Sequence, residues 1–154
     1  MQVITINNNP ELFKKACRLI FDSTVLPVRP NVDWDKWFTA ISARFQNKFP
    51  TIWALLSDDG ELIGTINMIE DDLGNGTTLS PWLGGFAIKP AYRGRKIGGV
   101  LIEAVKAKAK ENGYSKLYLR TETTSAYYKH LGWSFVEKAI DKHGTATEVY
   151  SIEI

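Results

Sequence analysis

A run of glycines and cationic side chains near the middle of the chain has the composition of an anion-binding turn. The run is Arg93-Gly94-Arg95-Lys96-Ile97-Gly98-Gly99. Glycines let the backbone turn sharply and approach a ligand with its amide groups pointing inward. The first turn of a following helix adds free N–H groups and the positive end of a dipole. These features suit a phosphorylated ligand, above all a pyrophosphate, and the alternative is a solvated basic turn.

The elements on either side of this turn are a strand and a helix. Trp82–Ile88 is nearly all apolar, which is typical of a strand covered on both faces, and Pro90 ends it. The turn lacks the G-x-x-x-x-G-K-S/T spacing of a P-loop and the G-x-G-x-x-G spacing of dinucleotide-binding folds. After the turn, apolar residues at helical spacing predict an amphipathic helix that stops at Asn112-Gly113. The apolar stripe of this helix consists of Ile97, Val100, Leu101, Ala104 and Val105.

The turn resembles the acyl-CoA pyrophosphate loop of the GNAT superfamily of N-acetyltransferases, whose signature is R/Q-x-x-G-x-G/A. Arg93 holds the first position and Gly98 the last, whereas Lys96 replaces the middle glycine. Lysine keeps the main-chain amide and adds a charge, but it would be strained if the position required a positive φ. A second segment, AYYKHLGWSFVEK, resembles the C-terminal Y-x-x-L-G-F/W segment of the family, with Tyr128 in the tyrosine position.

This resemblance implies an α/β (α+β) fold in one domain over residues 1–154. A GNAT-like fold has a central mixed, mostly antiparallel sheet of about seven strands, flanked by about four helices. The resemblance also implies acetyl-CoA as co-substrate and no metal. The residues expected to bind the cofactor are Phe86, Ala87, Ile88, Arg93, Gly94, Arg95, Lys96, Ile97, Gly98 and Gly99.

By the same resemblance, Tyr128 is the tyrosine that donates a proton to the leaving thiolate. The reference pKa of a phenol is near 10, so the group is protonated at neutral pH. Tyr127 stands beside it, and the spacing to Leu131-Gly132 favours Tyr128 for this role. Gly84-Gly85-Phe86 is a sequence in which a β-bulge costs little, and such a bulge exposes main-chain groups to the thioester in the family. The alternative is that both tyrosines only pack in the core.

The general base is less evident, because the Trp82–Ile88 strand carries no carboxylate. Glu70 and Glu122, each beside the end of an expected strand, are the candidates, and an ordered water is an equal alternative. The run Glu70-Asp71-Asp72 predicts a solvated turn. Alternatively, one of its carboxylates faces the acceptor, where it attracts a cationic amine or serves as its base.

The remaining patterns predict the other elements of one domain. Asn9-Pro10 and Asp33 have the residue types that begin helices, and Asp58-Asp59-Gly60 is typical of a hairpin turn. One predicted helix begins at Pro10, a second covers Trp34 to about Asn47, and a third covers Thr123–Leu131, whereas Val25–Val32 is predicted as a loop. In the second helix, Trp34 and Trp37 either pack in the core or form a wall of the acceptor pocket. The other predicted strands are Gln2–Ile6, Thr51–Ser57, Glu61–Ile69, Ser115–Thr121, Trp133–Lys138 and Thr145–Ile154.

The composition limits the classes of protein to consider. The chain has 154 residues, of which 44% are hydrophobic and 23% charged, as in an ordinary globular domain. A net charge of +2 argues against nucleic acid as a partner, and no apolar run is long enough for a membrane span. The single cysteine, Cys17, excludes an internal disulfide and favours a packed thiol in a reducing cytoplasm.

We therefore expect an N-acetyltransferase that moves the acetyl group of acetyl-CoA to a primary amine. The expected mechanism is direct attack in a ternary complex, and the expected partner is a small-molecule amine, with a homodimer common among relatives. Two alternatives remain open: a noncatalytic acyl-CoA-binding or sensing domain, and a protein or peptide N-acetyltransferase.

Overall fold

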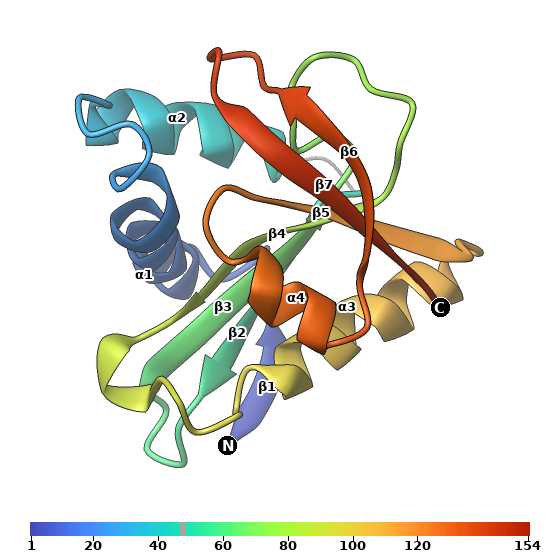
Figure 1. Cartoon of the computed structure of the whole chain (residues 1–154). Helices are drawn as coiled ribbons and strands as arrows, with labels where there is room; N and C mark the ends of the chain where they lie inside the picture. The colour runs from blue at the N-terminus through green and yellow to red at the C-terminus, as the bar shows by residue number, and fades with distance from the viewer. Residues whose placement is uncertain (47–48) are drawn as a thin grey trace.

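A computed structural model describes residues 1–46 and 49–154 of the chain. Strands and helices follow one another in the order that the sequence predicts (Figure 1). The strands are β1 (Gln2–Thr5), β2 (Thr51–Leu56), β3 (Leu62–Ile69), β4 (Trp82–Ile88), β5 (Lys116–Thr121), β6 (Ser134–Ile140) and β7 (Ala146–Glu153). The helical segments are α1 (Pro10–Ile20), the π-helical turn η1 (Phe21–Val25), α2 (Trp34–Arg44), the 3-10 turn η2 (Pro90–Tyr92), α3 (Gly99–Glu111) and α4 (Ser125–His130).

The seven strands form one mixed sheet in the order β1-β2-β3-β4-β5-β7-β6. Every neighbouring pair is antiparallel except β4 and β5, which are parallel and joined only at the pair Trp82 and Tyr118. At this junction the Tyr118 N–H donates to the Pro81 carbonyl at 3.0 Å. Beyond it, the ladder between the two strands stops, and the sheet is split toward their carboxyl ends. The predicted fold, a mixed and mostly antiparallel sheet with four α-helices, is confirmed.

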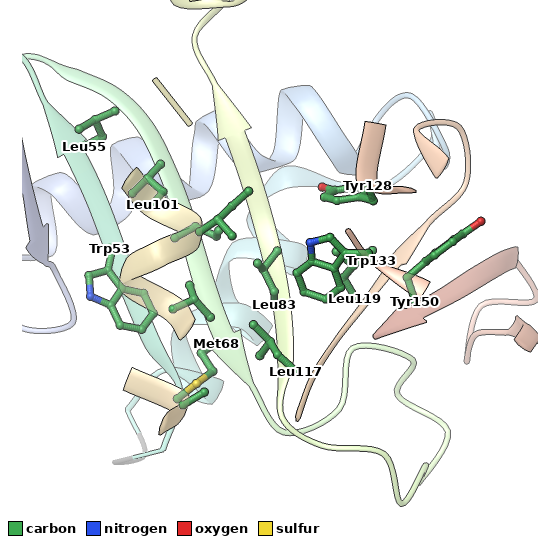
Figure 2. Close-up of a cluster of buried hydrophobic side chains, with 14 of the residues drawn as sticks. Trp53, Leu55, Met68, Leu83, Leu101, Leu117, Leu119, Tyr128, Trp133 and Tyr150 are labelled. Atoms are coloured by element: carbon green, nitrogen blue, oxygen red, sulfur yellow. The ribbon is translucent and has the colours of Figure 1, made fainter. Parts of the chain in front are cut away.

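The helices cover the two faces of the sheet (Figure 1). One face packs against α3 and α4, and Figure 2 shows part of this core, including Leu101 of α3, Tyr128 of α4 and Leu83 of β4. The other face packs against α1 and the aromatic residues around α2. Because both faces are covered, β2 and β3 are buried along almost their whole length, which explains their continuous apolar sequences.

Several element boundaries follow from the capping residues that the sequence indicates. The side chain of Asn9 accepts a hydrogen bond from the Leu12 N–H at 3.1 Å, and Asp33 accepts one from the Lys36 N–H at 3.0 Å. These bonds satisfy main-chain donors that the first turn of a helix leaves free. Beyond the C-terminal end of α3, Gly113 has a φ of +85°, which is the left-handed conformation predicted for the residue that ends this helix.

Three details differ from the sequence predictions. The apolar stripe of α3 was predicted to include Val100, which is 51% exposed, and Ile97, which precedes the helix. Helix α3 begins at Gly99, and its buried face includes Ile102, which the predicted stripe does not contain. The chain after α1 continues into the π-helical turn η1 up to Val25, where a loop was predicted to begin. Helix α2 ends at Arg44, and Asn47, where its end was predicted, lies outside the described residues.

A β-bulge interrupts β4 next to the split in the sheet. Asn67 of β3 pairs with Gly84 and Thr65 pairs with Ala87, so the two residues Gly85 and Phe86 stand opposite one residue of β3. Gly85 has a φ of +53°, which side-chain-bearing residues rarely adopt. The bulge predicted for Gly84-Gly85-Phe86 is therefore present. It points main-chain groups of β4 away from the β3 ladder.

We expect Gly85→Ala to destabilise the fold by about 2–4 kcal/mol, because strain at positive φ and a steric clash add. A Cβ at this position would lie 2.3 Å from Asn67 Nδ2 and 2.9 Å from Ile20 Cδ1. Denaturant unfolding of the two proteins measures the difference. Gly76→Ala is the matched control, since Gly76 has a φ of +76° but no heavy atom within 4 Å of its Cβ position. The control should lose only about 1 kcal/mol, and equal losses in both variants would contradict a packed bulge.

Candidate functional site

A cavity of about 1200 Å³ opens where β4 and β5 separate. Its walls come from β3, β4 and β5, the turn at residues 93–99, η1, α2, the start of α4 and the turn between β6 and β7. A volume of this order is enough for more than one small ligand. The parallel pair places the carboxyl ends of β4 and β5 at the same edge of the sheet, where ligands of such sheets commonly bind.

The glycine-rich turn forms one end of this cavity. Gly94 has a φ of +75°, and Gly98 begins the first turn of α3 as its N-cap. A Cβ on Gly98 would lie 2.6 Å from Cζ of Phe86, so only glycine lets the turn pack this closely on β4. The first main-chain amide of α3 with an intrahelical bond is that of Leu101, which donates to the Gly98 carbonyl at 3.1 Å. The preceding amides are free of intrahelical bonds, which is the arrangement by which helix N-termini bind anions in other proteins.

The cationic side chains of the turn differ in their contacts. Arg93 Nε donates to the Ile88 carbonyl at 2.8 Å, so this side chain braces the turn against the end of β4. The guanidinium of Arg95 lies over the Tyr92 ring, 5.5 Å from its centroid. Lys96 is exposed and has a φ of +59°, so the strain expected for a lysine at this position is present.

Tyr128 lies on the buried side of α4, at the edge of the cavity. Its side chain is 8% exposed and packs edge-to-face on Trp133, with 6.2 Å between ring centroids. In Figure 2 the phenolic oxygen of Tyr128 points toward β4. Burial raises the pKa of the Tyr128 phenol well above its usual range, and the neighbouring Tyr127 and Asp72 add to the shift. Tyr127 also lines the cavity but is 45% exposed, so the more deeply placed tyrosine is the one that the sequence favours.

Two polar side chains lie against the glycines of β4 on the other side of the cavity. The Cβ position of Gly84 lies 2.8 Å from Asn67 Oδ1 and 3.4 Å from Asp72 Oδ1, so both oxygens approach the backbone of β4. Asn67 is only 5% exposed, and its Oδ1 has no hydrogen-bond partner among the described residues. Burial raises the pKa of Asp72 to about 7, although the charges of Arg120 and Arg44 oppose the shift. Asp72 is thus a carboxylate that changes charge near neutral pH.

Arg120 holds the loop that carries Asp72. One guanidinium nitrogen donates to the Asp72 carbonyl at 3.1 Å, and the other contacts the carboxylates of Glu122 at 2.7 Å and Asp141 at 2.9 Å. Asp141 belongs to the turn between β6 and β7, so this one side chain joins three segments around the cavity. Glu122, a base candidate from the sequence, therefore lines the cavity as the partner of a cation. Glu70, the other candidate, is exposed and is not part of the cavity lining.

A family model described as the acetyltransferase (GNAT) family matches residues 15–133 of the chain. The chain belongs to the GNAT acetyltransferase family. The match covers the glycine-rich turn and the part of the second segment from Tyr128 to Trp133. A comparison with curated protein sequences gave no match.

Solved structures of GNAT acetyltransferases share the fold at low sequence identity. An aminoglycoside 6'-N-acetyltransferase complexed with coenzyme A is 16% identical, with a TM-score of 0.77 over 99% of this chain and 97% of that chain. A GNAT-family acetyltransferase from Staphylococcus aureus Mu50 is 18% identical, with a TM-score of 0.73 over 99% of both chains. The aminoglycoside 6'-N-acetyltransferase from Enterococcus faecium is 17% identical, with a TM-score of 0.70 over 99% of this chain and 97% of that chain.

The remaining candidate residues are placed as follows in this GNAT domain. Cys17 is fully buried, and burial raises the pKa of its thiol to about 12, which agrees with a packed thiol. His130 and His143 are exposed at the rim of the cavity. Among residues 1–46 and 49–154, no three His, Cys, Asp or Glu side chains gather as a metal site would require. Within the same residues, the helices are too short or too polar to cross a membrane.

Sequence reasoning did not single out Asp72 or Asn67. Asp72 belongs to the acidic run for which a role at the acceptor was one alternative, but no pattern in the run separates it from its neighbours. Asn67 lies within an apolar strand, and a polar residue in such a strand is the signal that could have drawn attention to it. Their proximity depends on the register of β3 against the bulge of β4, which the sequence does not specify.

We expect Lys96→Gly to stabilise the fold by about 0.5–1 kcal/mol, because glycine removes the strain of a side chain at positive φ. The same change removes a charge from the turn and should weaken coenzyme A binding by about tenfold. Thermal unfolding with and without coenzyme A measures both effects. Lys96→Ala is the matched control, since it removes the charge and keeps the strain. An unstable Lys96→Gly protein would contradict the left-handed conformation at this position.

Proposed function

We propose that this GNAT acetyltransferase transfers the acetyl group of acetyl-CoA to a primary amine of a small molecule, by direct attack in a ternary complex. The observation that carries the proposal is the cavity between the separated ends of β4 and β5. It has an anion-binding turn at one end, a β-bulge in its wall, and a phenol and a carboxylate on either side of the bulge. Each of these features has a place in acyl transfer from a thioester.

The turn at residues 93–99 and the first turn of α3 would hold the pyrophosphate of acetyl-CoA through main-chain amides and the charge of Lys96. The hydrogen bond that Arg93 donates to the Ile88 carbonyl holds the turn at the end of β4. Main-chain groups of Phe86, Ala87 and Ile88 lie between the bulge and the turn, where they would contact the pantetheine arm. A neighbour with the same fold was solved with coenzyme A, which supports this choice of co-substrate.

In the reaction, the amine nitrogen attacks the thioester carbonyl carbon, a C–N bond forms, and the C–S bond breaks. The proton lost by the nitrogen goes to the Asp72 carboxylate, and the Tyr128 phenol gives a proton to the departing thiolate. Main-chain N–H groups at the Gly85-Phe86 bulge would stabilise the oxyanion of the tetrahedral intermediate. Both proton-transfer groups have suitable charge states, since the raised pKa of Tyr128 keeps it protonated and Asp72 is charged above a pKa of about 7.

Asp72 suits the role of base better than the two residues proposed from the sequence. Arg120 donates to one carboxylate oxygen of Glu122 at 2.7 Å, and a proton taken up by Glu122 would remove the charge on which this ion pair depends. Glu70 is exposed at the end of β3 and lies outside the cavity lining. Glu122, Glu70 and an ordered water remain alternatives that direct comparison of variants can separate.

The concave shape of the site supports a small-molecule acceptor over a protein surface. The acceptor would approach from α2 and the turn between β6 and β7, which wall the cavity on the side away from the pyrophosphate-binding turn. A flexible peptide terminus is the alternative acceptor. A noncatalytic acyl-CoA sensor would bind coenzyme A equally well, so only turnover separates it from the enzyme.

We expect Tyr128→Phe to lower turnover about a hundredfold, because the phenylalanine cannot protonate the leaving thiolate. Binding of acetyl-CoA should stay within about threefold, since the ring still packs on Trp133. Thiol release across a panel of amines measures turnover, and titration of acetyl-CoA measures binding. Tyr127→Phe, the neighbouring change on the exposed side of α4, is the control and should keep its turnover. An unchanged rate in Tyr128→Phe would remove this residue from the mechanism.

We expect Asp72→Asn to lower kcat/KM by about a hundredfold or more and to remove the rise in rate that we expect of the wild type near pH 7. The folded protein binds the Asp72 proton more tightly than the unfolded chain, because its pKa is raised to about 7 from 3.8. This contribution to stability is present at low pH and is lost as the pH rises from about 4 to 7. At pH 8, the variant should therefore unfold at a higher temperature than the wild type, by about 2–4 °C.

Glu122→Gln and Glu70→Gln are the matched carboxylate controls for this variant. Each should keep the rise in rate near pH 7, and neither should become more stable at pH 8. If one of them loses the pH dependence while Asp72→Asn keeps it, that glutamate is the base. If all three variants keep it, the proton leaves through water.

A further inference from the structure

The acceptor half of the cavity, its part away from the pyrophosphate-binding turn, has an unusual balance of charge. It is walled by the segment from η1 through α2, the loop after β3 and the turn between β6 and β7. In Figure 1, α2 and the β6–β7 turn lie at the top, whereas the turn before α3 lies at the lower left, at the opposite end of the molecule. The elements α2 and the β6–β7 turn are therefore separated from the turn proposed to bind the cofactor phosphates, whereas η1 reaches that turn through Ser23, whose Oγ lies 3.5 Å from Arg93 Nη2.

Most carboxylates in the acceptor half already have hydrogen-bond or ion-pair partners within the protein. Asp71 accepts hydrogen bonds from three main-chain N–H groups at 2.8 to 3.0 Å. Glu122 and Asp141 both pair with the guanidinium of Arg120. Among the described residues, none donates a hydrogen bond to the Asp72 carboxylate, which is left to act on a ligand.

The cations of the acceptor half, in contrast, have no carboxylate partners within the described chain. Arg44, at the end of α2, donates to the main-chain carbonyl of Asp71, which is a neutral acceptor. Arg29, Lys36 and Lys142 also line the cavity, and no ion pair within 4.0 Å joins any of them to a described carboxylate. Arg29 and Arg44 are partly buried, so water screens their charges less than it would at an open surface.

His143 lies in the turn between β6 and β7, beside these cations. Burial lowers the pKa of its imidazole, and the charges of Arg29 and Lys142 lower it further. The attraction of Asp141 does not outweigh these effects. A ligand that enters this end of the cavity therefore meets net positive charge.

Beside the bulge, the polarity is reversed. The unpartnered Asn67 Oδ1 and the free Asp72 carboxylate both approach the backbone of Gly84. Both atoms are hydrogen-bond acceptors, and a buried acceptor without a partner costs free energy until a ligand supplies a donor. This pair suits the N–H groups of an ammonium or amine at the point of attack. The acceptor half thus offers hydrogen-bond acceptors beside the bulge and cations on its other walls.

We propose that the acceptor is an amine that also carries a carboxylate, such as an α-amino acid, with the amine at Asn67 and Asp72 and the carboxylate toward Arg44 and Arg29. This inference rests on the proposed acetyltransferase function. Arg44 lies close enough to Asp72 to lower its pKa, so the two binding points are compatible with a compact zwitterion. Trp37, Ile41 and Val28 line the same region and form an apolar surface for a side chain.

The same charges disfavour a polycationic acceptor. Two of the structurally similar proteins are aminoglycoside 6'-N-acetyltransferases, and an aminoglycoside carries several ammonium groups. Only one of these groups can lie at the Asn67 and Asp72 pair. The others would face the cations at the rim, and repulsion between like charges opposes binding.

The test compares acceptors that differ only in the carboxylate. Thiol release from acetyl-CoA is measured with each of a set of amino acids, with the corresponding amino acid amides, with the decarboxylated amines, and with an aminoglycoside. L-phenylalanine, L-phenylalaninamide and phenethylamine form one such series. We expect the carboxylate-bearing member of the best series to have a kcat/KM at least about tenfold above those of its two analogues.

Two variants locate the carboxylate. Arg29→Gln and Arg44→Gln should each lower the ratio of kcat/KM between the carboxylate-bearing acceptor and its neutral analogues by about tenfold, mainly through the KM of the carboxylate-bearing acceptor. Because Arg44 also bonds a main-chain carbonyl, Arg29→Gln keeps the test valid if the Arg44 variant is unstable. Lys110→Gln, on the exposed end of α3 and outside the cavity lining, is the matched charge control and should change nothing.

The outcomes separate this inference from the proposed function. Faster turnover of the amide, the simple amine or the aminoglycoside would overturn the inference and leave the acetyltransferase function standing. If no amine releases thiol, the proposed function fails. Binding of N-acetyl-phenylalanine and N-acetyl-phenethylamine to the coenzyme A-loaded protein then decides the inference. Tighter binding of the carboxylate-bearing compound, lost in Arg29→Gln, supports the anion site, and equal binding overturns it.

Discussion

The whole site depends on the way in which β4 and β5 pair. Two parallel strands need a crossover between them, and α3 supplies it. Since the strands are joined only at Trp82 and Tyr118, the sheet opens toward their carboxyl ends, where the crossover begins after β4 and α4 begins after β5. The start of α3 and the start of α4 thus reach the same edge of the sheet. A continuous ladder between β4 and β5 would close the cavity and would leave the helix ends without a common site.

The wall of this opening depends on glycine in two ways. At Gly85 the backbone adopts a conformation that forms the bulge, and at Gly84 and Gly98 the missing side chains leave room for close contacts. Asn67 and Asp72 approach one side of β4 through the space at Gly84, and the ring of Phe86 fills the space at Gly98. Polar groups with strong desolvation costs can therefore lie next to a main chain that is free to bind a ligand. The shifted pKa of Asp72 is a direct result of this close packing.

Much of this arrangement could be predicted from sequence, because its signals are local. Trp82–Ile88 has exactly the bounds of β4 in the structure, and Asn9, Asp33 and Gly113 end or begin helices as predicted. The glycine-rich turn and Tyr128 lie in one cavity, as the family resemblance implies. Their roles in binding and catalysis are still predictions.

The parts that could not be predicted depend on contacts between distant segments. The proximity of Asp72 to Gly84 follows from the register of β3 on β4, and the pairing of Asp141 with Arg120 follows from the packing of the turn between β6 and β7 against the end of β5. No local pattern specifies either of them. The charge balance of the acceptor half has the same origin, since its carboxylates and cations come from four separate segments of the chain.

The burial of Cys17 has a practical consequence for studies of this protein. Cys17 is the only cysteine of the chain, and its sulfur is held as a protonated thiol in the core between α1 and the sheet. Disulfide reagents react with the thiolate, so the folded protein should be silent toward them. The colour that such a reagent develops therefore counts coenzyme A set free by turnover, without a background from the enzyme. When the protein unfolds, one additional thiol per chain becomes reactive, and the same reagent then reports the unfolded fraction.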